Sequence, residues 1–267
     1  MDIIRPGRLD EALDALAAHP EAIVLAGGTD LMVQVNYQGL RAPVVVSVRR
    51  LPELRRIEGD FIGAGVTWAR LEQAPWPALA QAARTVGSPQ IRAMGTLGGN
   101  LGTASPAGDG LPFLDTAEAT IEVASRAGGV RRLHWDKFLV GPKRNGLRPG
   151  ELILGTRLPE HLPARQGFAK VGARNAMAIA VASACLLRDE DGTTRLALGS
   201  VGPTPLRARR AEEMISGERH PSPAAIAEFG RLVAEEVQPI TDHRSTEAYR
   251  RHAAAVLARR LLERCTP

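Results

Sequence analysis

The run TLGGNLGTASPAGD, residues 96–109, is the most glycine-dense part of this chain. It combines small side chains, several hydroxyl groups and one carboxylate. Backbone with so few side chains can lie close against a large flat or phosphorylated ligand. The alternative interpretation is a glycine-rich loop that binds nothing.

A second glycine-rich turn, AGGTD at residues 26–30, directly follows the apolar run Ile23–Leu25. Gly27 and Gly28 can adopt a positive φ and carry no side chain that would block a ligand. Successive N–H groups in such a turn can form an anion-binding nest, and Thr29 adds a hydroxyl donor. Taken alone this motif is more often a tight turn, but the two turns together favour a phosphorylated ligand.

Several familiar signatures are absent from the sequence. It contains no GxxxxGK[ST] phosphate loop and no GxSxG nucleophile elbow, and GAGVTW at 63–68 lacks the third glycine of a dinucleotide fingerprint. Cys185 and Cys265 are too few for an iron–sulfur cluster and are interpreted as a buried residue and an exposed tail thiol. The six histidines have no metal-ligand spacing, so no metal site is expected.

The pattern of apolar residues predicts an α+β fold, because strands and helices do not alternate strictly. Pro159, Pro163 and Gly167 mark a boundary, and the turn at 189–192 then links two strands of a small antiparallel sheet. The predicted strands are Ile23–Leu25, Val44–Val48, Phe61–Gly65, Thr120–Ala124, Val130–Leu133, Leu152–Leu158, Phe168–Val171, Ala178–Leu187 and Arg195–Val201. The predicted helices are Arg8–Ala18, Leu79–Val86, Arg207–Ile215, Pro223–Val237 and Thr246–Glu263.

Charge and hydropathy argue against a nucleic-acid-binding module and against a membrane-spanning protein. The 267 residues carry a net charge of +5, and arginines gather late, at Arg207, Arg209, Arg210, Arg250, Arg251, Arg259, Arg260 and Arg264. Aromatic residues make up only 4%, which disfavours a nucleic-acid-binding module and favours a solvated or subunit-facing basic surface. No apolar run approaches the roughly 20 residues of a membrane span, and the N-terminus has no apolar leader, so a cytoplasmic protein is expected.

With both turns in view, the sequence resembles the FAD-binding (medium, flavoprotein) subunits of the xanthine dehydrogenase and aerobic carbon monoxide dehydrogenase family of molybdenum hydroxylases. In that family an AGGTD-type and a T[LI]GGN-type loop jointly hold the FAD pyrophosphate. The resemblance covers nearly the whole chain. It continues through GSPQIRAMG at 87–95, GELILGTRLP at 150–159, FAKVGARNAMAIA at 168–180, LGSVGPTPLRARRAEEMISG at 198–217 and DHRSTEAYRRHAAAVLARRLL at 242–262.

The resemblance implies a two-part FAD-binding domain of the p-cresol methylhydroxylase / vanillyl-alcohol oxidase type. Its parts are an N-terminal FAD-binding subdomain at 1–51 and a second FAD-binding subdomain at 52–163. A small C-terminal flavoprotein domain at 164–267 follows, with a three-stranded antiparallel sheet and helices.

The resemblance also implies which residues contact the cofactor. Lys170 resembles a lysine close to the isoalloxazine, Asp109 an aspartate near the ribose and adenine side, and Val86 a position that is aromatic in some members. No catalytic residue is implied. The implied FAD-binding residues are Leu25, Ala26, Gly27, Gly28, Thr29, Asp30, Leu31, Val86, Gly87, Gly95, Thr96, Gly99, Asn100, Thr103, Ser105, Asp109, Leu152, Ile153 and Lys170.

The implied function is that of an electron-transfer oxidoreductase subunit, with non-covalent FAD, that is not active on the organic substrate alone. Electrons would reach FAD from molybdopterin and two 2Fe–2S clusters on partner chains and leave to an external acceptor. The partners would be a small iron–sulfur subunit and a large molybdopterin subunit, forming a heterotrimer. The alternative is a self-sufficient FAD-dependent oxidase or reductase. The sequence names neither the substrate nor the acceptor (NAD, quinone or oxygen).

Overall fold

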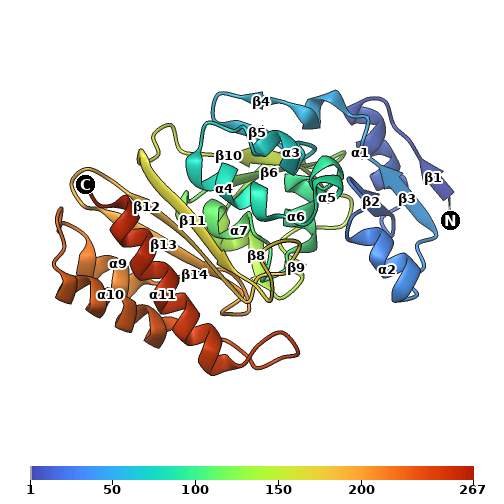
Figure 1. Cartoon of the computed structure of the whole chain (residues 1–267). Helices are drawn as coiled ribbons and strands as arrows, with labels where there is room; N and C mark the ends of the chain where they lie inside the picture. Colours follow the sequence, from blue (N-terminus) through green and yellow to red (C-terminus); the bar gives the residue numbers. More distant parts are fainter. Residues whose placement is uncertain (1) are drawn as a thin grey trace.

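The computed structural model describes residues 2–267, and its N-terminal part is a small parallel sheet (Figure 1). The strands β1 (Asp2–Ile4), β2 (Ile23–Leu25) and β3 (Val44–Ser47) lie in the order β1-β3-β2. The helix α1 (Leu9–Ala18), within the predicted range Arg8–Ala18, buries Ala12 and Leu16 against this sheet. The helix α2 (Leu31–Tyr37) begins directly after the AGGTD turn and buries none of its residues.

A five-stranded antiparallel sheet forms the middle of the molecule, with order β4-β5-β10-β6-β7. Its core contains Leu79, Leu97 and Phe113, all fully buried. The strands are β4 (Ile57–Glu58), β5 (Phe61–Gly63), β6 (Thr120–Ser125), β7 (Gly129–His134) and β10 (Leu152–Arg157). The helical segments are η1 (Pro52–Arg55), α3 (Trp68–Leu71), α4 (Pro77–Thr85), α5 (Pro89–Met94), α6 (Leu97–Thr103), α7 (Leu111–Thr116) and α8 (Trp135–Phe138), and a hairpin of β8 (Leu139–Gly141) and β9 (Arg144–Asn145) completes this part.

The C-terminal part is an antiparallel sheet covered on one face by helices (Figure 1). Three of its strands match the prediction in place, but the sheet has four, because Leu206 and Arg207, the first residue of a predicted helix, pair with β13 instead. The strands are β11 (Arg165–Val171), β12 (Ala182–Arg188), β13 (Thr194–Gly199) and β14 (Leu206–Arg207). The helices are α9 (Arg209–Ile215), α10 (Pro223–Glu236) and α11 (Glu247–Cys265).

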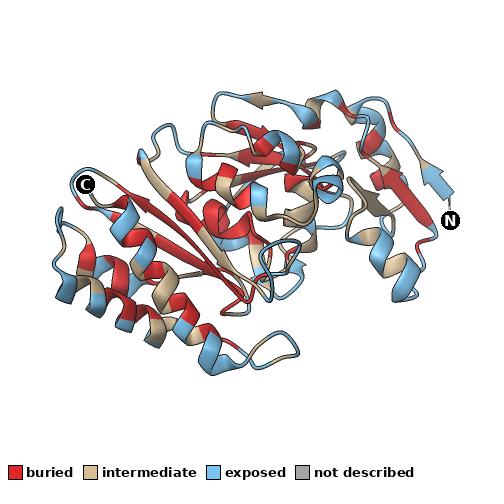
Figure 2. Cartoon of the chain, in the orientation of Figure 1, coloured by how far each residue is buried: buried red, intermediate tan, exposed pale blue. Residues whose placement is uncertain are grey.

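The strand β12 joins two of the three apolar cores (Figure 2). Cys185 and Leu187 belong to the core of the middle sheet, whereas Ala184 and Leu186 belong to the core under helices α9 to α11. Alternate residues of a strand point to opposite faces, so β12 is buried on both sides. The C-terminal sheet is therefore the layer between the middle part and the last helices.

Three predictions about residues of the C-terminal part are wrong. Cys265 is not an exposed tail thiol but is 4% exposed, because it closes the core under α11. Arg207 and Arg250 do not belong to a solvated basic surface, since their side chains are only 6% and 4% exposed and carry ion pairs. The segment 178–181, predicted as strand, precedes β12 as irregular chain.

The α+β prediction is confirmed, and each of the three larger sheets lies within one of the ranges 1–51, 52–163 and 164–267. Whether these ranges are separate domains stays a prediction. Between residues 2 and 267, no helix is long and apolar enough to cross a membrane.

Candidate cofactor-binding site

The structure brings the two glycine-rich turns together, although about 70 residues separate them in the sequence. Thr103 at the end of α6 donates a hydrogen bond from Oγ1 to Oδ2 of Asp30, at 3.3 Å. A Cβ atom built on Gly27 would lie 1.9 Å from the carbonyl oxygen of Met94. Only glycine therefore allows the AGGTD turn to contact the residues that lead into α6.

The AGGTD turn presents a row of free backbone donors. The N–H groups of residues 27 to 31 donate to no acceptor within the described residues 2–267. Gly28 has φ +75°, whereas Gly27 does not use the left-handed region that its residue type allows. Successive free N–H groups are what an anion-binding nest requires, so this turn can hold a phosphate group.

Residues Leu97–Thr103 of the glycine-rich run 96–109 form the helix α6, not the loop that their composition suggests. The first N–H groups of α6 already have acceptors: Leu97 donates to the carbonyl of Val66 at 3.0 Å and Gly98 to that of Ala64 at 2.8 Å. Gly99 donates to Oγ1 of its N-cap residue Thr96, also at 3.0 Å. The helix α6 therefore offers a surface with few side chains, called here the wall of α6, beside the AGGTD turn. It offers fewer free N–H donors than that turn.

Gly98 and Gly99 differ in what surrounds them. A Cβ atom on Gly98 would lie 2.6 Å from the Cβ of Ala64, so this glycine is required by packing. A Cβ atom on Gly99 would meet only Oγ1 of Thr96, at 3.2 Å, among the described atoms within 4 Å. A side chain at position 99 would consequently project into the open space that a ligand of this wall would fill.

Asp109 and Lys170 form a buried ion pair, although 61 residues separate them. Lys170 donates from Nζ to Oδ2 of Asp109 at 2.6 Å and to the carbonyl of Thr85 at 3.1 Å. Their side chains are only 7% and 9% exposed, and Oδ1 of Asp109 is buried without a partner in the described part of the chain. Burial raises the pKa of Asp109 to about 6, although the ammonium group of Lys170 opposes this shift.

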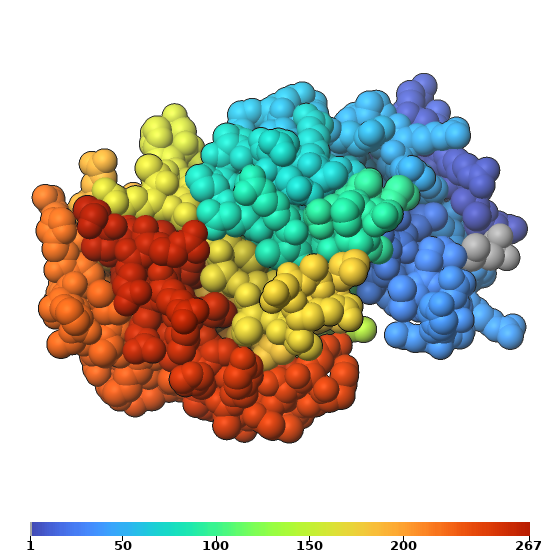
Figure 3. Space-filling view, in the orientation of Figure 1, coloured from blue at the N-terminus to red at the C-terminus, as the bar shows by residue number. Residues whose placement is uncertain are grey.

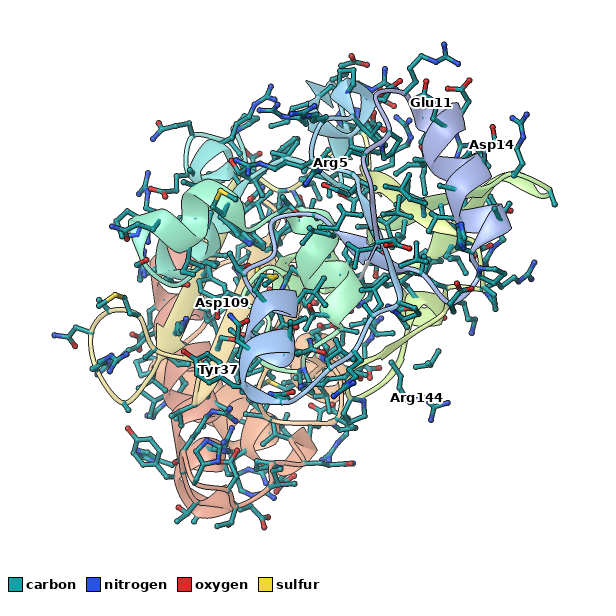
Figure 4. The ribbon with its side chains drawn as sticks, turned by 90° about the vertical axis from the view of Figure 1, so that its right-hand side faces the viewer. Arg5, Glu11, Asp14, Tyr37, Asp109 and Arg144 are labelled. Atoms are coloured by element: carbon teal, nitrogen blue, oxygen red, sulfur yellow. The ribbon has the colours of Figure 1, made fainter. Side chains whose placement is uncertain are left out.

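This contact bears on the roles implied by the resemblance. A lysine near the isoalloxazine and an aspartate near the adenine side of FAD would belong to opposite ends of the cofactor. Because Asp109 and Lys170 form an ion pair, the two side chains can lie only at the same end of a bound dinucleotide. Asp109 lies within the outline of the molecule in the side view, whereas Arg144 lies toward its right-hand side (Figure 4).

Val86, Gly87 and Asn100, also predicted to contact the cofactor, have other partners within the chain. Val86 and Gly87 follow α4, and both of their carbonyl oxygens accept hydrogen bonds from Nη1 of Arg92, at 3.3 Å and 3.2 Å. Asn100 is packed against the backbone of Gly108 and Gly110, with its Oδ1 atom buried and unpartnered among the described residues.

Three predicted contacts are less open to a ligand through their side chains. Ser105 accepts a hydrogen bond from the N–H of Ala107 at 3.3 Å. Leu152 and Ile153 of β10 have their side chains in two apolar cores and are 3% and 6% exposed. If these two residues contact a ligand, their backbone atoms are the groups that would do so.

The arrangement fits FAD in its chemistry. Free N–H groups suit a diphosphate, and the glycine wall of α6 admits a flat or extended ligand. The buried Asp109–Lys170 ion pair carries no net charge, but it fixes the position of the Lys170 ammonium group. Sequence reasoning missed two residues of this site. Thr85 lies in no motif, and Arg92 lies in the GSPQIRAMG segment but was not predicted to contact the cofactor; both are recognised through their contacts with Lys170, Val86 and Gly87.

Comparison with known protein families identifies the family of this chain. Residues 1–161 match the family of FAD-binding domains in molybdopterin dehydrogenases, and residues 168–265 match the carbon monoxide dehydrogenase flavoprotein C-terminal domain. The chain belongs to this family of FAD-binding oxidoreductase subunits. The resemblance inferred from the glycine-rich turns is thereby confirmed.

Individual relatives support the same assignment. The chain is 34% identical to the nicotinate dehydrogenase FAD-subunit of Eubacterium barkeri, over 81% of this chain and 79% of that protein. It is 30% identical to the xanthine dehydrogenase FAD-binding subunit of Escherichia coli O157:H7, over 97% and 93% of the two chains.

Solved structures extend the likeness to the whole fold. Quinoline 2-oxidoreductase from Pseudomonas putida 86 has a chain that superposes with a TM-score of 0.91 at 25% identity, covering 99% of this chain and 96% of that one. Carbon monoxide dehydrogenase from Hydrogenophaga pseudoflava gives 0.90 at 28% identity, with the same coverage. The FAD-binding part and the C-terminal part are therefore arranged in this chain as in those enzymes.

Proposed function

We propose that this flavoprotein carries electrons within a molybdenum hydroxylase, from iron–sulfur clusters on a partner chain through FAD to an external acceptor. The observation that carries the proposal is that the two glycine-rich segments lie together, with the free N–H groups of residues 27–31 beside α6. Family membership supports FAD as the ligand. When bound, FAD supplies the redox chemistry, while the protein supplies position and electrostatics.

The chain's own residues have separable tasks in this proposal. The N–H groups of residues 27–31 bind the diphosphate, where each charge-assisted bond contributes about 1.5–3 kcal/mol. The predicted contacts at Thr96, Gly99, Asn100, Thr103 and Ser105 border the cofactor from α6 and the segment after it. Lys170, fixed by Asp109 and Thr85, holds a positive charge near the flavin end.

Partner chains are proposed because of the ligands that this chain lacks. A 2Fe–2S cluster needs about four cysteine or histidine ligands, and the two cysteines here are both buried, far apart in sequence and packed in apolar cores. The clusters and the molybdopterin therefore sit on a small iron–sulfur subunit and a large molybdopterin subunit. We place the assembled heterotrimer in the cytoplasm, which cell fractionation tests.

Reconstitution tests the electron-carrier function. The purified FAD-loaded chain is expected to take up electrons from a chemical reductant without turning over purines, aldehydes, carbon monoxide or N-heterocycles. Adding both partner subunits should establish turnover with the complex's own substrate, and omitting the iron–sulfur chain should abolish it. Turnover by the lone chain at ordinary enzymatic rates, on the order of 1 per second or more, would instead identify a self-sufficient flavoenzyme.

A further inference from the structure

Residues 126–151 carry the whole net charge of the chain. They contain seven lysines and arginines but only two acidic residues, whereas the rest of the chain has 27 of each. More than half of the residues in this segment are exposed. The segment is nevertheless mostly hidden in the space-filling view, where the middle part and the C-terminal helices form the surface (Figure 3). The excess positive charge therefore lies on a different side of the molecule from α11.

Three cations of this segment are uncompensated. Lys143 and Arg144 lie at the turn between β8 and β9, Arg148 follows β9, and all three are exposed. Within residues 2–267 their side chains form no ion pair and no hydrogen bond. The other four cations of the segment pair with carboxylates at 2.6–3.1 Å. Residues 139–148, called here the basic hairpin, therefore attract an acidic partner.

The strand β7 forms the outer edge of the five-stranded sheet, beside this hairpin. It pairs with β6 on one side, and the backbone of residues 129–133 bonds to no other part of the chain that the structure describes. Val130 in this strand is 61% exposed. A six-residue edge strand with a free row of N–H and C=O groups can accept a further strand.

Charged side chains can instead protect an edge strand from such pairing. In β7, however, Arg131 is bound to Glu151 at 2.6 Å and Arg132 to Glu122 at 2.9 Å. Because adjacent residues of a strand point to opposite faces, these two side chains lie over the faces of the sheet. The edge itself is left open.

Contacts join the edge strand and the basic hairpin to α6. Arg131 donates from Nη2 to the carbonyl of Gly146 at 3.1 Å, within the basic hairpin. Asn145 donates from Nδ2 to the carbonyl of Gly102 at 2.9 Å, near the end of α6. A protein bound to this surface would therefore lie next to the helix that borders the proposed cofactor.

We propose that the iron–sulfur subunit docks on this surface through an acidic extended segment, which pairs with the outer edge of β7. Carboxylates of that segment contact Lys143, Arg144 and Arg148. This inference rests on the proposed function, in which electrons reach FAD from the iron–sulfur subunit. Backbone hydrogen bonds along β7 supply affinity, and the cations of the basic hairpin select an acidic sequence.

Two other occupants fit this surface less well. A second copy of the chain would bring the same uncompensated cations together, and like charges across an interface repel. A nucleic acid would find no exposed Trp, Tyr or Phe to stack on in residues 126–151, because Trp135 and Phe138 are buried.

Calorimetric titration of the FAD-loaded full chain with the purified iron–sulfur subunit tests the proposal. We expect association that weakens as salt rises. The double variant Lys143→Glu/Arg144→Glu should bind the subunit at least tenfold more weakly, with FAD affinity unchanged. Arg260→Glu/Arg264→Glu changes two exposed arginines of α11, from the cluster predicted to be solvated or subunit-facing, and should leave both affinities unchanged.

Hydrogen exchange of the same complex tests the strand pairing separately. Amides on the outer edge of β7 should exchange at least tenfold more slowly in the complex than in the free chain, because they gain acceptors there. The strand β4 at the opposite edge of the sheet is the control, and its amides should exchange equally in both states.

Several results would overturn the assignment. These are no association with the iron–sulfur subunit, equal association of wild type and the Lys143/Arg144 variant, an equal loss in the Arg260/Arg264 variant, or unchanged exchange of β7 in the complex. Binding of the molybdopterin subunit alone, with the same dependence on Lys143 and Arg144, would also overturn it. A chain that takes up no FAD would contradict the proposed function instead, and titration of that chain would still report on the basic hairpin.

Discussion

At the scale of single residues, Asp109 is the titrating group with the sharpest consequence. Its folded-state pKa of about 6 exceeds the unfolded value of about 3.9, so the folded chain binds more protons between these two pH values. The free energy of unfolding therefore falls as pH rises through this window. The measured quantity is the unfolding free energy of wild type minus that of Asp109→Asn. We predict that this difference decreases by about 2–3 kcal/mol from pH 4 to pH 6.5.

Urea unfolding of both proteins across this pH range is the measurement. Asp115, whose pKa burial also raises to about 6, is present in both proteins and cancels in the difference. Lys170→Gln provides a second check, because removing the ammonium group should raise the pKa of Asp109 further, as seen by carboxyl NMR titration. A wild-type minus variant difference that stays constant with pH would refute the assignment.

The residues of this pair also show where sequence reasoning stops. Asp109 and Lys170 were each identified from a motif, but no local pattern encodes a contact across 61 residues. Arg207 and Arg250 appear in an arginine-rich region typical of a solvated surface. Their burial depends on acceptors from other elements, such as the carbonyls of Val181 and Ser200 for Arg250. Those acceptors are visible only after folding.

At the scale of elements, α6 depends on its cap. This helix has seven residues, three of them glycine, and glycine costs up to about 1 kcal/mol relative to alanine in a helix. Thr96 accepts the N–H of Gly99 at 3.0 Å. We predict that Thr96→Ala lowers the free energy of unfolding by about 1 kcal/mol and also weakens FAD binding, as measured by urea unfolding and by flavin titration.

Ser222→Ala is the matched control for the cap. Ser222 accepts the N–H of Ala225 at 3.1 Å at the start of α10, away from the two glycine-rich segments. It should cost a similar free energy of unfolding and leave FAD affinity unchanged. Equal effects of both variants on FAD affinity would mean that the α6 cap has no special part in the site.

Strands were more predictable than short helices in this chain. The strand Ile23–Leu25 was predicted with its observed bounds, and most of the other predicted strands lie within three residues of the observed ones, because β-branched runs bounded by turns are local signals. The strands of two or three residues β1, β4, β8, β9 and β14 were not predicted. The helices α2, α5, α6 and α7 have six or seven residues and were not predicted. Long-range packing stabilises α6, where Leu97 and Leu101 are fully buried four residues apart.

At the scale of the whole molecule, Arg207 ties the C-terminal sheet to the middle part. Its guanidinium group pairs with Glu212 at 2.8 Å between Nη2 and Oε2, and Nη1 reaches Glu118 at 3.2 Å and the carbonyl of Asp115 at 3.3 Å. Arg207→Met would leave the buried carboxylate of Glu212 with only the exposed Arg209, at 3.5 Å, and the N–H of Leu196 as partners. We predict a loss of about 3–5 kcal/mol in unfolding free energy, measured by urea denaturation.

Arg231→Met serves as the comparison, because Arg231 lies in ion pairs on the exposed face of α10 with 54% of its side chain exposed. Exposed pairs contribute little, at most about 1 kcal/mol. A loss for Arg207→Met no larger than that for Arg231→Met would argue against a connecting role between the two parts.

The central claim is that FAD lies, without a covalent bond, between the AGGTD turn and α6. The most direct measurement is the FAD dissociation constant of wild type and Gly99→Val, with Gly7→Val as the control at an exposed glycine whose added Cβ meets only Glu11, at 3.7 Å. We predict that acid precipitation of the wild type leaves its FAD in the supernatant. We further predict that Gly99→Val keeps the fold by circular dichroism but binds FAD at least tenfold more weakly, whereas Gly7→Val binds it normally. Unchanged FAD affinity in a folded Gly99→Val protein, or flavin that stays with the acid-precipitated wild type, would contradict the account.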